Sequence, residues 1–239
     1  MRLSHDQVSF FRRNGYFKIP RVLSNKAVAA LKAASWDHAR RKVHPFQTHN
    51  GDLVRLDQVV QRGGVFRAAA LAPPLLGALE GLLGPNIELT LNRHNHVTFN
   101  TAESTTFRLH RDVLQWSRGM VTVIVYLEDS TLENGCTHMI PGSQQLPFIG
   151  VPNNGGTWMD EHEEFTGLLG QALPIPMPAG GALLLDSLAF HSVGTNKGPG
   201  TRMSLTLGFH SQDELSGSSP DPKKLLVRGS YLYKGNDKR

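Results

Sequence analysis

The sequence has little of what marks a secreted or membrane-spanning protein. It contains one cysteine, Cys136, which excludes an intramolecular disulfide framework and fits a reducing compartment. Its longest apolar runs fall far short of the roughly 20 residues that a membrane-spanning helix requires. Residues 1–17 carry scattered charges and lack the apolar core and cleavage site of a secretory signal. We therefore expect a cytoplasmic protein with no membrane partner.

Basic clusters interleaved with aromatic side chains are also missing. The net charge is +5 and the pI is about 9.5, but Lys and Arg are spread thinly, and the densest groups lie at 40–42 and in the tail. A nucleic-acid interface would need a basic stripe with aromatic residues between the cations. We therefore expect no nucleic-acid partner, and a surface that mildly favours anionic small molecules. A monomer and a homodimer both fit.

The first third of the chain has helical spacing of its apolar residues. Ser4 and Ser24 are candidate N-caps, and Pro73-Pro74 divides a third apolar segment into two pieces. A brief strand is expected before Pro20, and 48–65 is expected to be loop or short strand. The helices are expected over 4–14, 25–42 and, in two pieces, 66–84.

After Pro85 the pattern changes to alternation of apolar and polar residues, with turn-forming clusters between the runs. This rhythm predicts an antiparallel sandwich or barrel. We expect one domain over 1–239, with a helical portion at 1–85, a β core at 86–210 and a tail at 211–239. The alternating runs cover 87–100, 105–116, 119–129, 136–140, 180–191 and 201–210.

His110 and Asp112 stand two apart in a run that reads as extended. Side chains at i and i+2 of a strand point to one face, so this imidazole and this carboxylate can bind one object. They would supply two ligands of a facial 2-His-1-carboxylate site, which leaves open positions on a non-haem Fe(II). His191 is the best candidate for the third ligand, and Arg202 opens a following run suited to hold an anionic co-substrate.

The HxD and HRD motifs also have other interpretations. A lone HxD occurs often by chance, and HRD also opens the kinase catalytic loop. Ser117 stands where a kinase would have Asn, and no Gly-rich loop, strand Lys or DFG accompanies the motif. The joint pattern of HxD, His191 and Arg202 therefore favours the metal site.

One expected strand, within 87–100, is polar on both faces. Asn92, His94, His96 and Thr98 share one of these faces. Such a face either lines a wet cavity or belongs to a solvated edge strand, and the sequence leaves both open.

The segments FRRNGYFKIPRVLS at 11–24 and ENGCTHMIPGSQ at 133–144 complete a recognisable pattern. With HRD, His191 and Arg202, they make the chain resemble the phytanoyl-CoA dioxygenase family of Fe(II)/2-oxoglutarate oxygenases over nearly its whole length. The resemblance implies a mainly β protein with flanking α-helices, a cupin-like jelly roll or double-stranded β-helix with N-terminal helices packed on one side. The family's PGSH is PGSQ here, with Gln144, so the substrate stays open.

The resemblance also implies roles for single residues. His110, Asp112 and His191 match the iron ligands, and Arg202 matches the residue that pairs with the far carboxylate of 2-oxoglutarate. A planar guanidinium suits that carboxylate because it offers two parallel donors. Ser204 and Asn92 are further candidates for binding 2-oxoglutarate. Candidate contacts of the prime substrate are Trp116, Trp158 and His94.

The implied activity uses Fe(II), 2-oxoglutarate and O2 to oxidise, most simply to hydroxylate, an unactivated C–H bond of a small molecule. Succinate and CO2 are released, and secondary metabolism is a candidate setting. Related halogenases lack the carboxylate ligand, whereas Asp112 is present here. The alternative is a non-catalytic cupin-like jelly roll that binds a small molecule or a metal.

Residues 144–175 are expected to form an irregular lid over the cavity. They hold many Gly and Pro, an acidic run, the isolated Trp158 and a Gly155-Gly156 pair that offers hinge freedom. Long irregular segments in compact domains are often active-site lids. Alternatively, Trp158 only packs this segment onto the scaffold.

Overall fold

The structure is a computed structural model, and it describes residues 2–101, 107–112, 119–146, 157–212 and 222–229. Predictions that involve other residues, such as the substrate contact expected of Trp116 and the Gly155-Gly156 hinge, lie outside the described residues.

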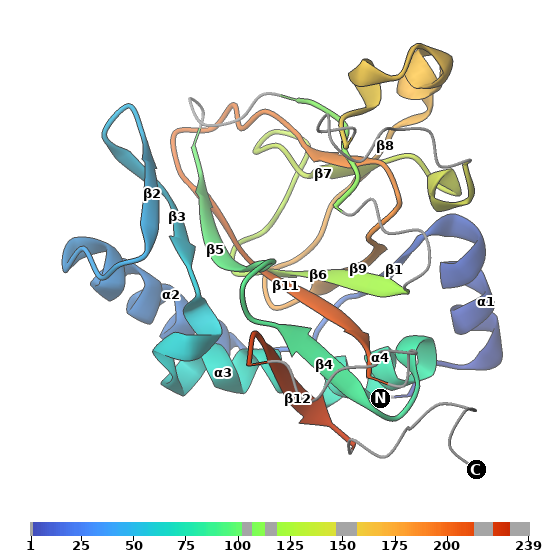
Figure 1. The fold of residues 1–239 in the computed structure, drawn as a ribbon. Coiled ribbons are helices and arrows are strands. Elements are labelled where there is room, and N and C mark those ends of the chain that lie inside the picture. Colours follow the sequence, from blue (N-terminus) through green and yellow to red (C-terminus); the bar gives the residue numbers. More distant parts are fainter. Residues whose placement is uncertain (1, 102–106, 113–118, 147–156, 213–221, 230–239) are drawn as a thin grey trace.

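Two antiparallel sheets enclose a central cavity (Figure 1). The strands of the large sheet are β1 (Tyr16–Ile19), β2 (Phe46–His49), β3 (Asp52–Asp57), β4 (Ile87–Thr90), β5 (Asn95–Asn100), β6 (Met120–Tyr126), β9 (Ala182–Asp186), β11 (Arg202–Ser211) and β12 (Lys224–Arg228). Those of the small sheet are β7 (Thr137–Met139), β8 (Leu173–Ile175) and β10 (His191–Val193). Among the described residues, the large sheet runs β1-β9-β6-β11-β5-β3-β2, with β4 between β11 and β12, and the small sheet runs β10-β7-β8. The predicted mainly β jelly roll is confirmed.

The helices cover the outer face of the large sheet (Figure 1). They are α1 (His5–Asn14), α2 (Asn25–Arg40), α3 (Gly64–Ala70) and α4 (Pro73–Leu83), with 3-10 turns at Val59–Arg62, Ser143–Gln145, Met159–Glu161 and Glu163–Gln171. Leu31, Phe66 and Leu79 from these helices pack against strand residues such as Phe99 and Leu205. Within the described residues no single helix is long and apolar enough to cross a membrane, and α3 and α4 meet that criterion only as a pair bent by 41°.

The predicted helix starts are confirmed. The Ser4 hydroxyl accepts from the backbone N–H of Gln7 at 3.3 Å, and the Gln7 side chain accepts from the Ser4 N–H at 2.9 Å, which is a capping box. Ser24 caps α2 in the same way through the N–H of Ala27. Gly15, in the left-handed region at φ 77°, ends α1 and turns the chain into β1.

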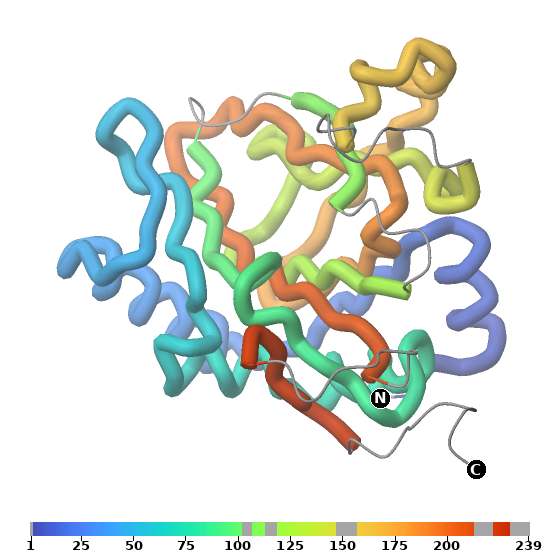
Figure 2. Tube along the Cα trace, viewed as in Figure 1, coloured from blue at the N-terminus to red at the C-terminus, as the bar shows by residue number. Residues whose placement is uncertain are grey.

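The first 85 residues differ from the expected helical portion, because they also supply three strands of the large sheet. β2 and β3 form a hairpin, and β3 pairs with β5 through Arg55↔Thr98 and Asp57↔His96. The segment gave a weak strand signal because the hairpin lies at the edge of the sheet and only one of its strand residues, Leu56, is buried. The tail also contributes a strand, since β12 runs beside β4 (Figure 2).

Two predicted strands are each broken in two. The run 87–100 bends after β4, and His94 takes a left-handed φ of 47° just before β5. The run 180–191 leaves the large sheet after β9 and enters the small sheet as β10. The carboxylate of Asp186 accepts from the Leu188 N–H at 3.0 Å in the turn between them. A hydrophobic pattern cannot reveal this change of sheet, because both strands are buried.

The run expected at 105–116 makes only isolated bridges in its described part. His110 pairs with His191 and with Trp158, so segment 107–112 lies between β10 and residues 157–159. The described part of the expected lid is more regular than predicted. It holds two 3-10 turns, and it ends in β8, which belongs to the small sheet.

Candidate metal centre and its cavity

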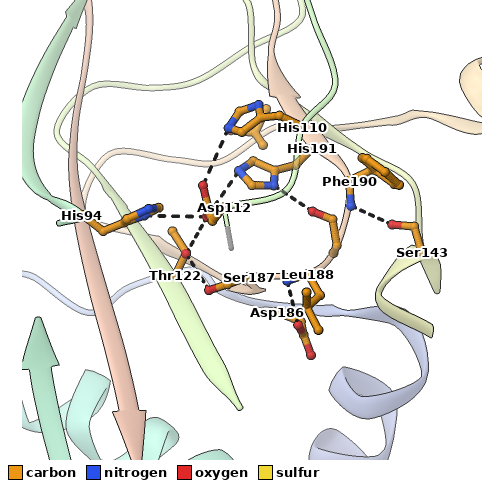
Figure 3. Close-up of polar contacts among 12 residues, drawn as sticks. His94, His110, Asp112, Thr122, Ser143, Asp186, Ser187, Leu188, Phe190 and His191 are labelled. Atoms are coloured by element: carbon orange, nitrogen blue, oxygen red, sulfur yellow. Dashed lines mark hydrogen bonds and ion pairs between the residues drawn. The ribbon is translucent and has the colours of Figure 1, made fainter. Parts of the chain in front are cut away.

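Three side chains that line the cavity converge on one another (Figure 3). His110 Nε2 lies 3.7 Å from Asp112 Oδ1, and His191 Nε2 lies 3.6 Å from Asp112 Oδ2. One donor atom from each residue lies within 4.8 Å of the other two. The sequence prediction that these residues meet is therefore confirmed.

Backbone hydrogen bonds hold these three residues together. His110 and His191 exchange N–H···O bonds in both directions at 2.9 Å, and the N–H of Asp112 donates to the carbonyl of Ser187 at 2.9 Å. Nδ1 of His191 lies 2.9 Å from the carbonyl of Ala189, so it carries the proton and leaves the Nε2 lone pair free. That lone pair points toward Asp112 (Figure 3).

Two hydroxyl groups orient the carboxylate. Thr122, on β6, donates to Asp112 Oδ2 at 2.6 Å, and its oxygen lies 2.9 Å from the Ser187 hydroxyl. Since the Thr122 proton is directed at the carboxylate, Ser187 is the donor in the second bond. Both residues are buried. Such partners fix the orientation of a metal-binding side chain, and their removal typically lowers metal affinity by about 10–100-fold.

The protonation states suit a cation. Burial acts to raise the pKa of Asp112, but His191, His94 and His110 outweigh it and hold that pKa well below its ordinary value. Burial lowers the pKa of His191, which outweighs the opposite effect of Asp112. The centre therefore offers an ionised carboxylate and a neutral imidazole, which are the forms that bind metals.

The donor set fits a divalent transition metal. Two His nitrogens and one carboxylate oxygen are the donors of the facial triad that leaves positions open on non-haem Fe(II). Ligands about 2.1 Å from one ion lie about 3 Å apart when they are adjacent, so the observed 3.6–3.7 Å separations require only a small closure. Open space for further ligands lies beside the triad in a cavity of about 420 Å³.

Arg202 marks the inner end of this cavity. It lies on β11, is only 2% exposed, and has no ion pair or hydrogen-bond partner at Nε among the described residues. Burial lowers the pKa of its guanidinium. A buried cation without a counter-ion is costly, so the position calls for an anion. Ser204, two residues along the strand, also lines the cavity.

The family model of phytanoyl-CoA dioxygenase (PhyH) matches residues 11–204. The chain belongs to this family. Its fold and donor set agree with the 2-oxoglutarate-dependent non-haem iron class that the family resemblance implies.

This phytanoyl-CoA dioxygenase family member is similar to one curated protein in sequence and to solved structures in fold. It is 28% identical over 205 residues to "Dioxygenase af480" of Aspergillus fumigatus, which covers 80% of this chain and 61% of that relative. The chain thus spans about three fifths of the relative's length. The epimerase SnoN, solved with Fe3+, alpha ketoglutarate and nogalamycin RO, has a TM-score of 0.70 at 20% identity, covering 97% of this chain and 95% of its own. EctD from S. alaskensis with bound Fe has a TM-score of 0.72 at 22% identity, and the match covers 88% of this chain and 77% of the EctD chain.

The polar face predicted around β5 lines the cavity of this family member, so the alternative of a solvated edge strand is wrong. Asn92, His94, His96 and Thr98 are all among the lining residues. His94 Nδ1 lies 3.7 Å from Asp112 Oδ2, beside the metal donors (Figure 3). The assignment of His94 to substrate and of Asn92 to 2-oxoglutarate stays a prediction.

Trp158 is not among the described residues that line the cavity. Its ring centroid is 5.0 Å from that of His110, and the Arg108 guanidinium stacks over the indole at 4.3 Å from the centroid. Arg108 also pairs with Asp160 at 2.7 Å. These contacts support the packing alternative, and the role of Trp158 as a substrate contact stays a prediction.

Sequence reasoning missed Thr122, Ser187 and Arg55 as site residues. Thr122 carried a usable signal, because it is a polar residue in the otherwise apolar run VTVIV and shares its face with Ile124 toward the cavity. Ser187 and Arg55 gave no such signal, since one lies in an unpredicted turn and the other in an unpredicted hairpin.

Proposed function

We propose that the protein hydroxylates an unactivated C–H bond of a small-molecule substrate, with 2-oxoglutarate as co-substrate. One O2 is consumed, one oxygen atom enters the alcohol and the other enters succinate, and CO2 leaves. The single observation that carries the proposal is the facial donor set of His110, Asp112 and His191 in one cavity with the buried, unpaired Arg202.

In this proposal His110, Asp112 and His191 hold Fe(II), which supplies oxygen activation when 2-oxoglutarate is bound to it. Nδ1–H of His191 stays on the Ala189 carbonyl and keeps Nε2 directed at the ion. The Thr122 hydroxyl occupies one lone pair of Oδ2, so the carboxylate cannot rotate freely. These three residues would thereby hold Fe(II) from one side, and the rest of the cavity would be left for reactants.

Arg202 binds the far carboxylate of 2-oxoglutarate in this arrangement. Each charge-assisted hydrogen bond contributes about 1.5–3 kcal/mol, and the ion pair compensates the burial of the guanidinium. Ser204, two residues along β11, offers a hydroxyl on the same face. The hydroxyls of Tyr126 and Thr137 are paired with each other at 2.7 Å near this end, and burial raises the Tyr126 pKa to about 12, so this phenol stays a neutral donor.

The similar proteins support a small-molecule substrate. One is described as a dioxygenase, and another, SnoN, is an epimerase solved with nogalamycin RO. One fold thus serves more than one outcome. Hydroxylation is proposed here because it requires nothing beyond the three reactants already named, the substrate, 2-oxoglutarate and O2, and secondary metabolism is the proposed setting.

The test begins without any prime substrate. Anaerobic addition of Fe(II) and 2-oxoglutarate to the wild type should produce the weak visible charge-transfer band of the chelate, and Asp112→Ala should not produce it. A panel of metabolites is then screened for substrate-dependent release of succinate, and product mass is checked for a gain of one oxygen atom. Absence of the band in the wild type would contradict the proposal, and a product with no added oxygen would replace hydroxylation with another outcome.

A further inference from the structure

Two neighbouring strands, β3 and β5, carry a second set of polar groups in the cavity, separate from Arg202. We infer that Arg55 on β3 and His96 on β5 form an oxyanion subsite, and that the prime substrate carries a carboxylate or phosphate group that binds there. This inference rests on the proposed function and names a chemical class for its substrate. Both residues line the cavity.

Arg55 is held in place from one side. Its Nε donates to Asp57 Oδ1 at 2.6 Å, and Asp57 Oδ2 accepts from Gln47 on the paired strand β2 at 2.9 Å. No described residue forms a hydrogen bond or ion pair with the two terminal nitrogens of Arg55. A guanidinium fixed through Nε retains a fork of parallel donors, which matches a carboxylate or phosphate edge.

His96 adds a donor from the adjacent strand. The register places Asp57 opposite His96 and Arg55 opposite Thr98, so the imidazole and the guanidinium belong to neighbouring rows of one surface. Nδ1 of His96 is buried and has no hydrogen-bond partner among the described residues. Burial and then Arg55 lower the pKa of His96 well below its ordinary value, so the ring is neutral. A buried polar atom without a partner is rare in a protein and indicates a missing ligand or water.

This subsite is distinct from the one at Arg202. Arg55 is close enough to influence the pKa values of both His94 and His96, whereas the titratable groups that influence the pKa of Arg202 are Tyr126, Cys136 and Glu128. Two different arginines therefore serve two regions of the cavity, and one 2-oxoglutarate molecule anchored on the metal and on Arg202 leaves Arg55 unused.

The charges of the cavity lead to the same conclusion. Among the described lining residues three are arginines, Arg55, Arg93 and Arg202, and the acid is Asp112. With Fe(II) and 2-oxoglutarate bound, the net charge of one group of residues and ligands is zero. The positive charges of the ion and Arg202 balance the negative charges of Asp112 and doubly charged 2-oxoglutarate. Asp57 offsets the charge of Arg55, and Arg93 is exposed and has no ion pair among the described residues, so one positive charge of the cavity lining remains uncompensated. An anionic substrate neutralises that charge and a neutral substrate does not.

The inference is tested by binding rather than by turnover. The wild-type protein is loaded with Fe(II) and saturating 2-oxoglutarate without oxygen, and is titrated calorimetrically with benzoate, phenyl phosphate and the neutral isostere benzamide. We expect at least one anion to bind tenfold or more tightly than benzamide, and the tighter of the two anions identifies the group. Arg55→Gln should remove this preference and leave the dissociation constant of 2-oxoglutarate unchanged. Arg67→Gln, which removes an exposed arginine of α3, is the charge-matched control and should keep the preference.

Three results would overturn the inference: equal binding of the anions and benzamide to the wild type, retention of the preference in Arg55→Gln, or loss of the 2-oxoglutarate band as the anion binds, which would place the anion at Arg202. Arg55→Lys keeps the charge without the fork and should restore only part of the affinity. Failure of the proposed function is separate, because it appears as a missing band before any anion is added.

Discussion

The two ends of the cavity are built on different parts of the same sheet. Arg202 lies on β11, between β5 and β6, and is 2% exposed. Arg55 lies on β3, next to the edge strand β2, and its side chain is 35% exposed. A central strand is fixed by neighbours on both sides, whereas an edge hairpin tolerates change. The fold therefore constrains the Arg202 end of the cavity, whereas the Arg55 end is open to variation in sequence.

The two arginines also differ in how their charge is compensated. Arg55 has Asp57 beside it at 2.6 Å, whereas Arg202 has no described hydrogen-bond partner at Nε. In the ligand-free protein, the unfavourable free energy of an uncompensated charge therefore falls at Arg202. The candidate metal centre lies where the two regions meet. Substitutions ranked by expected effect can separate these regions.

The largest effect is expected from the metal donors, which both ends require. His110→Ala, Asp112→Ala and His191→Ala should each lower turnover more than 100-fold and weaken Fe(II) binding, because three protein donors hold the ion. Metal titration and circular dichroism measure affinity and folding. His138→Ala, which removes an imidazole of the small sheet outside the cavity lining, is the matched control. Wild-type activity of any triad variant at low added iron would remove that residue from the centre.

Arg202→Leu should disable the inner end selectively. Loss of two charge-assisted hydrogen bonds, at about 1.5–3 kcal/mol each, predicts a rise of the KM for 2-oxoglutarate by about 10²-fold or more. Steady-state kinetics with 2-oxoglutarate and prime substrate varied in turn measure this, and Arg202→Lys should recover only part. An unchanged dependence on 2-oxoglutarate would refute the assignment.

The same substitution predicts a change in stability with an unusual sign. Removing a buried, uncompensated cation should leave the ligand-free protein at least as stable as the wild type. In the wild type, 2-oxoglutarate at 100 times its Kd should raise the free energy of unfolding by about 2.7 kcal/mol, and Arg202→Leu should lose this gain at the same concentration. Thermal unfolding with and without the ligand, both with metal present, decides the matter; equal shifts in the two proteins would contradict it.

A smaller effect is expected at Thr122, between the two ends. Thr122→Val keeps the shape of the side chain but removes the donor to Asp112, so Fe(II) affinity should fall about 10–100-fold. Thr122→Ser retains the hydroxyl and should stay close to the wild type. The Fe(II) dissociation constant is the measurement, and equal affinities of the Val and Ser variants would show that the hydrogen bond does not matter.

The smallest effect is expected at Arg108 and Trp158, which lie outside the described cavity lining. Arg108→Ala removes a solvent-exposed ion pair and a stack on Trp158, and such exposed contacts contribute little, so turnover should change only a few-fold. Trp158→Ala should impair turnover of the prime substrate more than binding of 2-oxoglutarate if the ring contacts substrate. Equal effects on both, with normal metal binding, would favour the packing alternative.

The sequence predicted that His110, Asp112 and His191 meet, because the residue types and the i, i+2 spacing of the first two indicate which side chains can share one site. It predicted α1, α2 and the later strands because caps and alternation act locally. It failed where tertiary pairing decides. The β2–β3 hairpin obtains its partners from β5, and the turn at Ser187 changes sheets with buried strands on both sides. Arg55 and Ser187 became visible as site residues only when these pairings placed Arg55 beside the cavity and Ser187 beside Thr122.

The β2–β3 hairpin has a consequence for diversification within such a fold. Within the described part of the chain it attaches to the sheet through one strand pairing, β3 with β5, and it contributes no residue to the candidate metal site. A hairpin of different length or sequence could replace it while the metal centre and the Arg202 pocket keep their own supports. Grafting segment 46–57 between relatives is thus a route to altered selectivity, in which new substrates are recruited by exchanging one peripheral module.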